Sequence, residues 1–154
     1  MIKFLFFTII CLSHPAAFSS DLSVLIGRWT YRSLINDPNP NTDFNILRFG
    51  VGIMTIESIE NGDLKGSLDF GPTFQMALTG KINDGQIVHL MIHGIGISRS
   101  NRDWAYDYES HLSLKWPNGV NQRPTLLGSV IRSAPHSGGT AQAGFVASWV
   151  AVKQ

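Results

Sequence analysis

Three ionisable side chains with the spacing of one strand face form the most acid-base-like arrangement in the chain. Asp107, Glu109 and His111 are two residues apart, so in a strand all three project from the same side. Inside an apolar barrel, two neighbouring carboxyl groups raise the pKa of one of them, which suits proton transfer. In water, the same triplet is an ordinary strand surface. Its role therefore depends on which face points inward.

The opposite face of the same stretch is aromatic and apolar. Between Trp104 and Trp116 the even positions are Trp104, Tyr106, Tyr108, Ser110, Leu112, Leu114 and Trp116. This sustained alternation is typical of a long strand with one buried face. We expect the aromatic face to point inward, as a core stripe or as the wall of a ligand pocket. On that expectation we predict no catalytic residue.

A second group, His89, Met91 and His93, also shares one strand face, and histidine with methionine is a ligand set used for copper. Residues four apart on a strand are separated by about 13 Å, so both histidines cannot bind one ion directly. A further ligand, such as His111 or His136, would have to come from elsewhere. We therefore predict ordinary strand histidines, with no metal site and no cofactor.

Three arginines could hold a carboxylate if they pointed inward. Arg28 and Arg32 share a face of the first predicted strand, and Arg132 lies near the end of the seventh. We expect all three at the surface. The segment 135–139, with His136 between a proline and two nearby glycines, could be either a lid over one rim of a barrel or a flexible loop.

Period-two alternation places these side chains on eight predicted strands, and helical periodicity is nearly absent. The strands cover residues 22–34, 51–59, 64–70, 74–82, 86–97, 104–116, 124–133 and 144–152. Most are separated by turn signals such as Asn61-Gly62, Gly71-Pro72, Asn83-Asp84-Gly85 and Asn118-Gly119. Such short connections predict antiparallel neighbours, because parallel strands need long crossovers.

The predicted fold is all-β, a single antiparallel up-and-down barrel of eight strands. Closure removes the two exposed edges that an open sheet would leave. A β-sandwich is the alternative. Eight strands enclose an interior that is either filled by side chains or able to hold one small ligand.

The N-terminus predicts export. Lys3 is followed by an apolar run from Phe4 to Leu12 and then by small residues, so we expect residues 1–19 to be a secretory signal peptide and residues 20–154 to be one barrel domain. The only cysteine, Cys11, falls in the first segment. Without Lys3, 11 of the 12 Lys and Arg remain against 11 Asp and Glu. We expect a secreted or periplasmic protein that has no nucleic-acid partner and no membrane span after cleavage.

The chain resembles the calycin group of barrels, which includes the lipocalins and avidins. The resemblance rests on Gly27-x-Trp29 in the opening strand and on the eight-strand meander. It implies a small apolar ligand held in the barrel mouth, and a basic residue near the last strand, here Lys153, packed over Trp29. Avidins follow their opening Trp with Asn and small hydroxyl residues that bind biotin. Thr30, Tyr31 and Arg32 follow here, so biotin binding is not predicted.

We therefore expect an exported, non-catalytic barrel that binds a small, largely apolar ligand in its lumen. The predicted ligand-binding residues are Trp29, Tyr31, Tyr106, Tyr108 and Trp149, since aromatic side chains offer large contact areas with polar tips. One alternative is a cofactor-free isomerase or cyclase in the same barrel, using an inward acid. Another is a structural or interaction protein of the cell envelope with a filled core.

Overall fold

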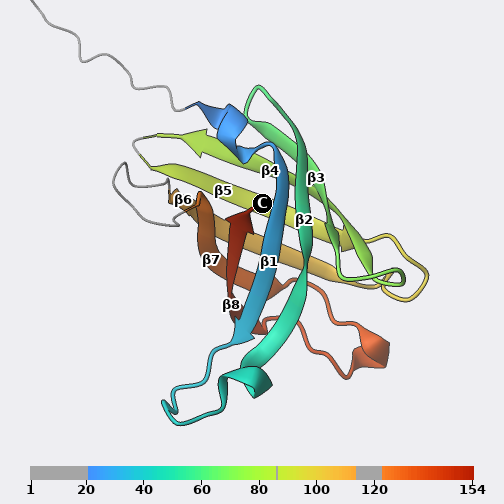
Figure 1. Cartoon of the computed structure of the whole chain (residues 1–154). Coiled ribbons are helices and arrows are strands. Elements are labelled where there is room, and N and C mark those ends of the chain that lie inside the picture. The colour runs from blue at the N-terminus through green and yellow to red at the C-terminus, as the bar shows by residue number, and fades with distance from the viewer. Residues whose placement is uncertain (1–20, 86, 114–122) are drawn as a thin grey trace, which may run out of the picture.

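The alternating segments form eight antiparallel strands that close into one barrel (Figure 1). The computed structural model describes residues 21–85, 87–113 and 123–154. Each strand pairs with the next along the chain, and the last pairs with the first, which confirms the predicted up-and-down barrel over the sandwich. The strands are β1 (Gly27–Ile35), β2 (Arg48–Glu60), β3 (Asp63–Asp69), β4 (Gln75–Asp84), β5 (Val88–Gly96), β6 (Ala105–Ser113), β7 (Thr125–Arg132) and β8 (Val146–Lys153).

The prediction that the first strand begins at Leu22 is wrong. Residues Leu22–Leu25 form a short 3-10 helix, η1, capped by the Asp21 carboxylate, which accepts a hydrogen bond from the Ser23 amide at 3.0 Å. The strand starts only at Gly27, whose φ of 117° is a backbone conformation that favours glycine. The apolar spacing of Leu22 and Val24 therefore marks a plug at one end of the barrel and not a strand.

The strand β2 begins three residues before the predicted Val51, because its pairing with β1 continues past a bulge. Ser33 pairs with Gly50 and Leu34 with Arg48, so Phe49 is the extra residue between them. Bulges redirect side chains at barrel rims. Two further 3-10 helices, η2 (Phe44–Leu47) and η3 (Ser137–Gly139), lie in the connections that follow β1 and β7.

The Asn61-Gly62 turn between β2 and β3 is confirmed. Both residues have positive φ, 53° and 80°, as a two-residue hairpin turn requires. The predicted turn 117–119, the end of the predicted sixth strand and the predicted signal peptide lie outside the described residues. Among the helices that the structure describes, none is long and apolar enough to cross a bilayer.

The end of the barrel that carries η1 is filled by side chains. Leu25 and Trp29 are fully buried there, and aliphatic residues from the other strands surround them; we call this the filled half (Leu25, Trp29, Ile56, Leu64, Leu90, Leu126 and Ala151). The inward positions change along the strands. In β2 they run from Ile56 and Met54 to Gly52 and Gly50, so this wall loses bulk toward the other end.

Candidate functional site

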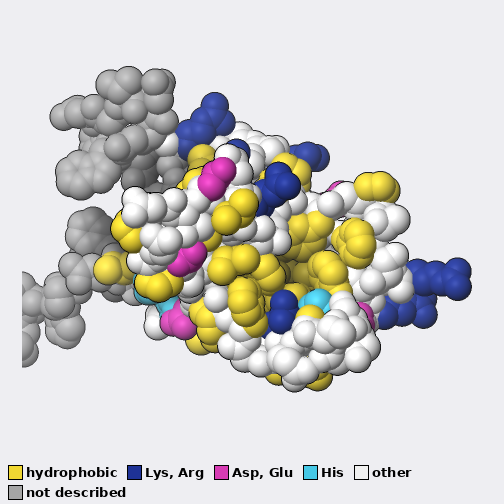
Figure 2. Space-filling view, turned by 90° about the horizontal axis from the view of Figure 1, so that it is seen from below, with side chains coloured by type: hydrophobic (Ala, Val, Ile, Leu, Met, Phe, Trp, Pro, Cys, Tyr) yellow, Lys and Arg dark blue, Asp and Glu magenta, His cyan; other side chains and the backbone are white. Residues whose placement is uncertain are grey.

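The other half of the barrel contains a cavity of about 500 Å³, which we call the hollow half. It opens at the end where the β1–β2, β3–β4, β5–β6 and β7–β8 connections lie, and Figure 2 shows it as a depression with mainly apolar walls. The lining residues are Tyr31, Ser33, Arg48, Phe49, Gly50, Val51, Phe70, Phe74, Met76, Trp104, Tyr106, Tyr108, Val130, Arg132 and His136.

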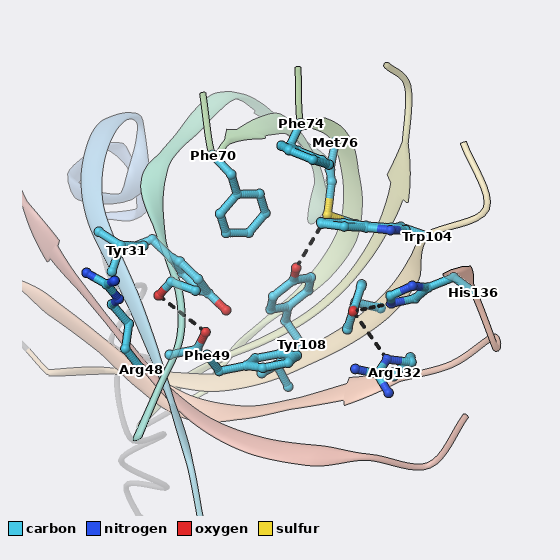
Figure 3. A pocket seen from close by; sticks show the side chains of 15 residues that line it. Tyr31, Arg48, Phe49, Phe70, Phe74, Met76, Trp104, Tyr108, Arg132 and His136 are labelled. Carbon is cyan, nitrogen blue, oxygen red and sulfur yellow. Dashed lines mark hydrogen bonds between the residues drawn. The ribbon is translucent and has the colours of Figure 1, made fainter. Parts of the chain in front are cut away.

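Aromatic rings from four separate segments form much of the wall (Figure 3). The Trp104 ring stacks on Phe74 with centroids 5.3 Å apart and an interplanar angle of 16°. Phe70 meets Tyr31 edge-on at 5.8 Å. These contacts fix the rings of neighbouring segments against one another, and together they give the cavity an apolar lining.

The inner end of the cavity is made by two tyrosines. Tyr31 and Tyr108 meet edge-on at 6.1 Å, and the Tyr108 hydroxyl contacts the Met76 sulfur at 3.8 Å. Burial raises the pKa of both phenols well above the ordinary value. Both hydroxyls are therefore neutral near pH 7.

A connected polar cluster lines the cavity where β6, β7 and the β7–β8 connection meet. The Tyr106 hydroxyl is 2.7 Å from His136 Nε2, and it accepts a hydrogen bond from Arg132 Nε at 3.3 Å. His136 Nδ1 lies 2.8 Å from the Ser137 hydroxyl, and the Ser137 amide donates to the Asp103 carboxylate. Burial, followed by the nearby Arg132 charge, lowers the pKa of His136, so the imidazole is mainly neutral at pH 7.

The segment 135–139 covers part of the cavity mouth through His136. This side chain is only 7% exposed and its ring packs 5.2 Å from that of Trp104. The sequence left open whether this segment is a lid or a flexible loop. The structure places one of its residues, His136, over the rim of the barrel. The pKa and the contacts of His136 follow from that position.

The expectation that Arg132 is a surface residue pointing outward is wrong. Its guanidinium lies over the rings of Phe49, Tyr106 and Phe145, at 5.9, 5.9 and 5.1 Å, and its Nη1 donates to the Gln142 carbonyl. Arg132 pairs with Tyr106 across β6 and β7, so the two residues share the inward face. The other two arginines of that expectation, Arg28 and Arg32, are exposed on the outside of β1.

The predicted ligand-binding residues divide into two groups. Tyr31, Tyr106 and Tyr108 line the cavity. Trp149 is buried behind two of them, with its ring 5.6 Å from Tyr31 and its Nε1 donating to a backbone carbonyl of β7. Trp29 lies in the filled half and does not reach the cavity. Ligand binding by these residues stays a prediction.

The contact that the calycin resemblance implied for Trp29 is present. Lys153 Nζ lies 4.9 Å from the centre of the Trp29 ring and donates to the Ile26 carbonyl. Trp29 Nε1 donates to the Leu25 carbonyl at 2.9 Å. Desolvation lowers the pKa of Lys153. These contacts close the barrel opposite the cavity mouth.

Sequence reasoning did not assign Phe49, Phe70, Phe74 or Arg48 to a site. Three of them flank glycine or a Gly-Pro turn: Phe49 precedes Gly50, and Phe70 and Phe74 enclose Gly71-Pro72. Aromatic residues beside turns at one end of a barrel are a usable signal for a mouth. The signal becomes readable only when the strand order shows which turns share an end.

The Asp107, Glu109 and His111 face points away from the cavity, as expected. The side chains of Asp107 and Glu109 are 54% and 61% exposed, and they pair with His93 at 2.6 Å and His89 at 3.0 Å. These residues cannot be the inward acid of an isomerase or cyclase. Within the described ranges, no group of three or more His, Cys, Asp or Glu side chains is placed to hold a metal ion.

Comparisons of the chain with family models, with curated proteins and with solved structures gave no significant match.

Proposed function

We propose that this barrel binds a small, largely apolar molecule in the hollow half and performs no chemistry on it. The cavity carries the proposal, since about 500 Å³ falls within the range of small-molecule sites. A wall of aromatic rings with a few convergent polar groups is the usual composition of such sites. A barrel acting only through its outer surface would not need a hollow interior.

The chemistry of the lining favours binding without reaction. Among the described residues, no Asp or Glu lines the cavity. Burial raises the pKa of Tyr31 and Tyr108, so their hydroxyls do not ionise near pH 7. Tyr106, Arg132 and His136 hydrogen-bond to one another, an arrangement that holds polar atoms in fixed positions.

Export is part of the same proposal. The apolar run after Lys3 and the absence of cysteine from residues 20–154 suit a protein that works outside the cytoplasm. A barrel held by packing and strand pairing needs no particular redox environment. Sequencing the N-terminus of protein recovered from its own cells, together with the fraction that contains it, tests the predicted cleavage near residue 19.

The binding test uses N-phenyl-1-naphthylamine, a neutral dye that becomes fluorescent in apolar sites. We expect saturable binding to the full chain. Val130, buried at the cavity wall, is changed to Phe to fill space, and we expect the affinity to fall about tenfold, equivalent to about 1.4 kcal/mol. Leu127→Phe, on the outer face of the same strand, is the matched control and leaves binding unchanged.

Two results contradict the proposal. One is a wild-type protein that does not bind the dye or any small molecule visible by native mass spectrometry after purification from its own host. The other is equal dye affinity in Val130→Phe and Leu127→Phe, with melting temperatures showing both folded. The second result would place the dye outside the cavity.

A further inference from the structure

We propose that the ligand is amphipathic and carries one anionic oxygen acid group, such as a carboxylate, which Arg132 binds. The apolar part of the ligand would lie among the rings of Phe70, Phe74 and Trp104. This inference rests on the proposed function, because it specifies the chemical class that the same cavity takes. The charges around the cavity, the placement of Arg132 and the contrast with Arg48 support it.

The two charged side chains that line the cavity, Arg48 and Arg132, are both cationic. The lining also contains His136, which is mainly neutral at pH 7, and no Asp or Glu from the described ranges. Figure 2 shows the same character, with basic and histidine side chains beside an apolar hollow. Opposite charge is the simplest complement of such a lining.

Arg132 is held in place, yet no Asp or Glu of the described residues forms an ion pair with it. Its Nε and Nη1 bond to Tyr106 and to the Gln142 carbonyl, and three aromatic rings pack around its guanidinium. The three ion pairs formed within residues 21–85, 87–113 and 123–154 are Lys81–Asp63, His89–Glu109 and His93–Asp107, so none includes Arg132. A guanidinium has five N–H donors, and contacts with the described residues use two of them, which leaves three for a ligand.

The surroundings of Arg132 increase the strength of such a contact. Its side chain is only partly exposed, and the Phe145 ring, 5.1 Å from the guanidinium, shields one side of it. In such surroundings a cation without a partner is costly, and a carboxylate with bidentate geometry removes that cost. Because the guanidinium is already positioned, little conformational freedom is lost on binding.

Arg48 has a different place and a different role. It is exposed, it lies at the rim where β2 begins, and in Figure 3 it stands apart from Arg132 and His136. A solvated arginine attracts an anion over a longer distance but contributes little to the bound state. We therefore assign the bound anion to Arg132 and the approach of the ligand to Arg48.

The test compares two dyes with one skeleton. N-phenyl-1-naphthylamine is neutral, and 8-anilinonaphthalene-1-sulfonate adds one anionic oxygen acid group to it. We expect Arg132→Gln to weaken binding of the sulfonate about tenfold or more, because it removes charge-assisted hydrogen bonds, which are stronger than neutral ones. Binding of the neutral dye should change less than about twofold. Arg28→Gln, on the outer face of β1, is the matched control and leaves both affinities unchanged.

Two further measurements keep the inference testable if Arg132→Gln does not fold. Arg48→Gln removes an exposed side chain, and we expect it to slow association of the sulfonate at low salt and to leave its dissociation rate unchanged. A carboxylate competitor, 2-naphthoate, should displace the sulfonate from wild type, and the corresponding alcohol should do so about tenfold less well.

The outcomes separate this inference from the proposed function. If the neutral dye binds in the cavity and Arg132→Gln weakens both dyes equally, or neither, the anion assignment is overturned and the binding function stands. Equal competition by the carboxylate and the alcohol would overturn it as well. If neither dye binds wild type, the proposed function fails first.

Discussion

The two halves of the barrel use the same strands for different purposes. Toward η1, the inward side chains are mainly aliphatic and fully buried, and Trp29 lies between the Leu25 carbonyl and Lys153. Toward the mouth, many of the inward side chains are aromatic, and a volume of about 500 Å³ is left open. We infer that the filled half contributes most of the packing energy. The hollow half can then keep a cavity whose lining side chains are not fully packed. Variants on either side can test this division.

The largest expected effect is at Trp29. Trp29→Ala deletes a fully buried ring, its hydrogen bond and its contact with Lys153, so we expect a loss of about 3–5 kcal/mol in the free energy of unfolding. Trp104→Ala removes a partly exposed ring of the cavity wall, and we expect roughly 1–2 kcal/mol. Urea unfolding measures both. Equal losses would remove the distinction between the halves.

Gly27→Ala is the next largest. A side chain at φ 117° is strained, and a Cβ there would lie 3.1 Å from Lys153 Nζ. We expect a loss of about 1–3 kcal/mol. Lys153→Met, which keeps an apolar stem over Trp29, separates the two causes. If Gly27→Ala costs no more than Lys153→Met in thermal unfolding, displacement of the lysine explains the effect without backbone strain.

Two buried serines give a smaller contrast of opposite sign. Ser110 lies on the inward face of β6, and its hydroxyl has no hydrogen-bond partner among the described residues. We expect Ser110→Ala to stabilise the protein by about 1 kcal/mol. Ser33, at the cavity, donates to the Gly50 carbonyl at 3.5 Å, so Ser33→Ala should not stabilise. A stabilised Ser33→Ala, or a destabilised Ser110→Ala, would contradict this reading of the two sites.

The smallest effect concerns pH. The pKa of His136 in the folded protein is below its ordinary value of 6.5, because of burial and the Arg132 charge, and the Asp103 carboxylate opposes this only in part. As pH falls below 6.5 the unfolded chain binds this proton first, so stability decreases toward the folded-state pKa. His136→Gln should reduce the fall in melting temperature between about pH 8 and about pH 5. An identical pH profile in both proteins would show that His136 does not contribute.

Alternation in the sequence predicted the fold because a strand side chain has only two directions. On β6, Tyr106, Tyr108, Ser110 and Leu112 are buried and the intervening residues are exposed, as the period-two pattern indicated. The same alternation, followed along β7 through Leu126, Gly128 and Val130, places Arg132 inward. That conclusion was available from the sequence and was missed because arginine was expected at the surface.

The position of a side chain along the barrel axis could not be predicted. Trp29 and Tyr31 both point inward, yet one lies in the filled half and the other lines the cavity. Alternation does not distinguish them, since the level of each residue depends on the register of all eight strands around the closed ring. Long-range placement also decides that His136 reaches Tyr106, thirty positions away in the sequence.

Closure of the ring through β1 and β8 affects how the chain reaches its final state. Trp29 lies opposite Lys153, and Ile35 opposite Ala147, so the first strand must wait for the last residues before its second side is paired. During synthesis, and during refolding, the sheet therefore has two free edges until the final strand arrives, and such edges promote aggregation. Contacts between distant positions also slow folding. A truncation that removes β8 would leave the chain permanently in that vulnerable state.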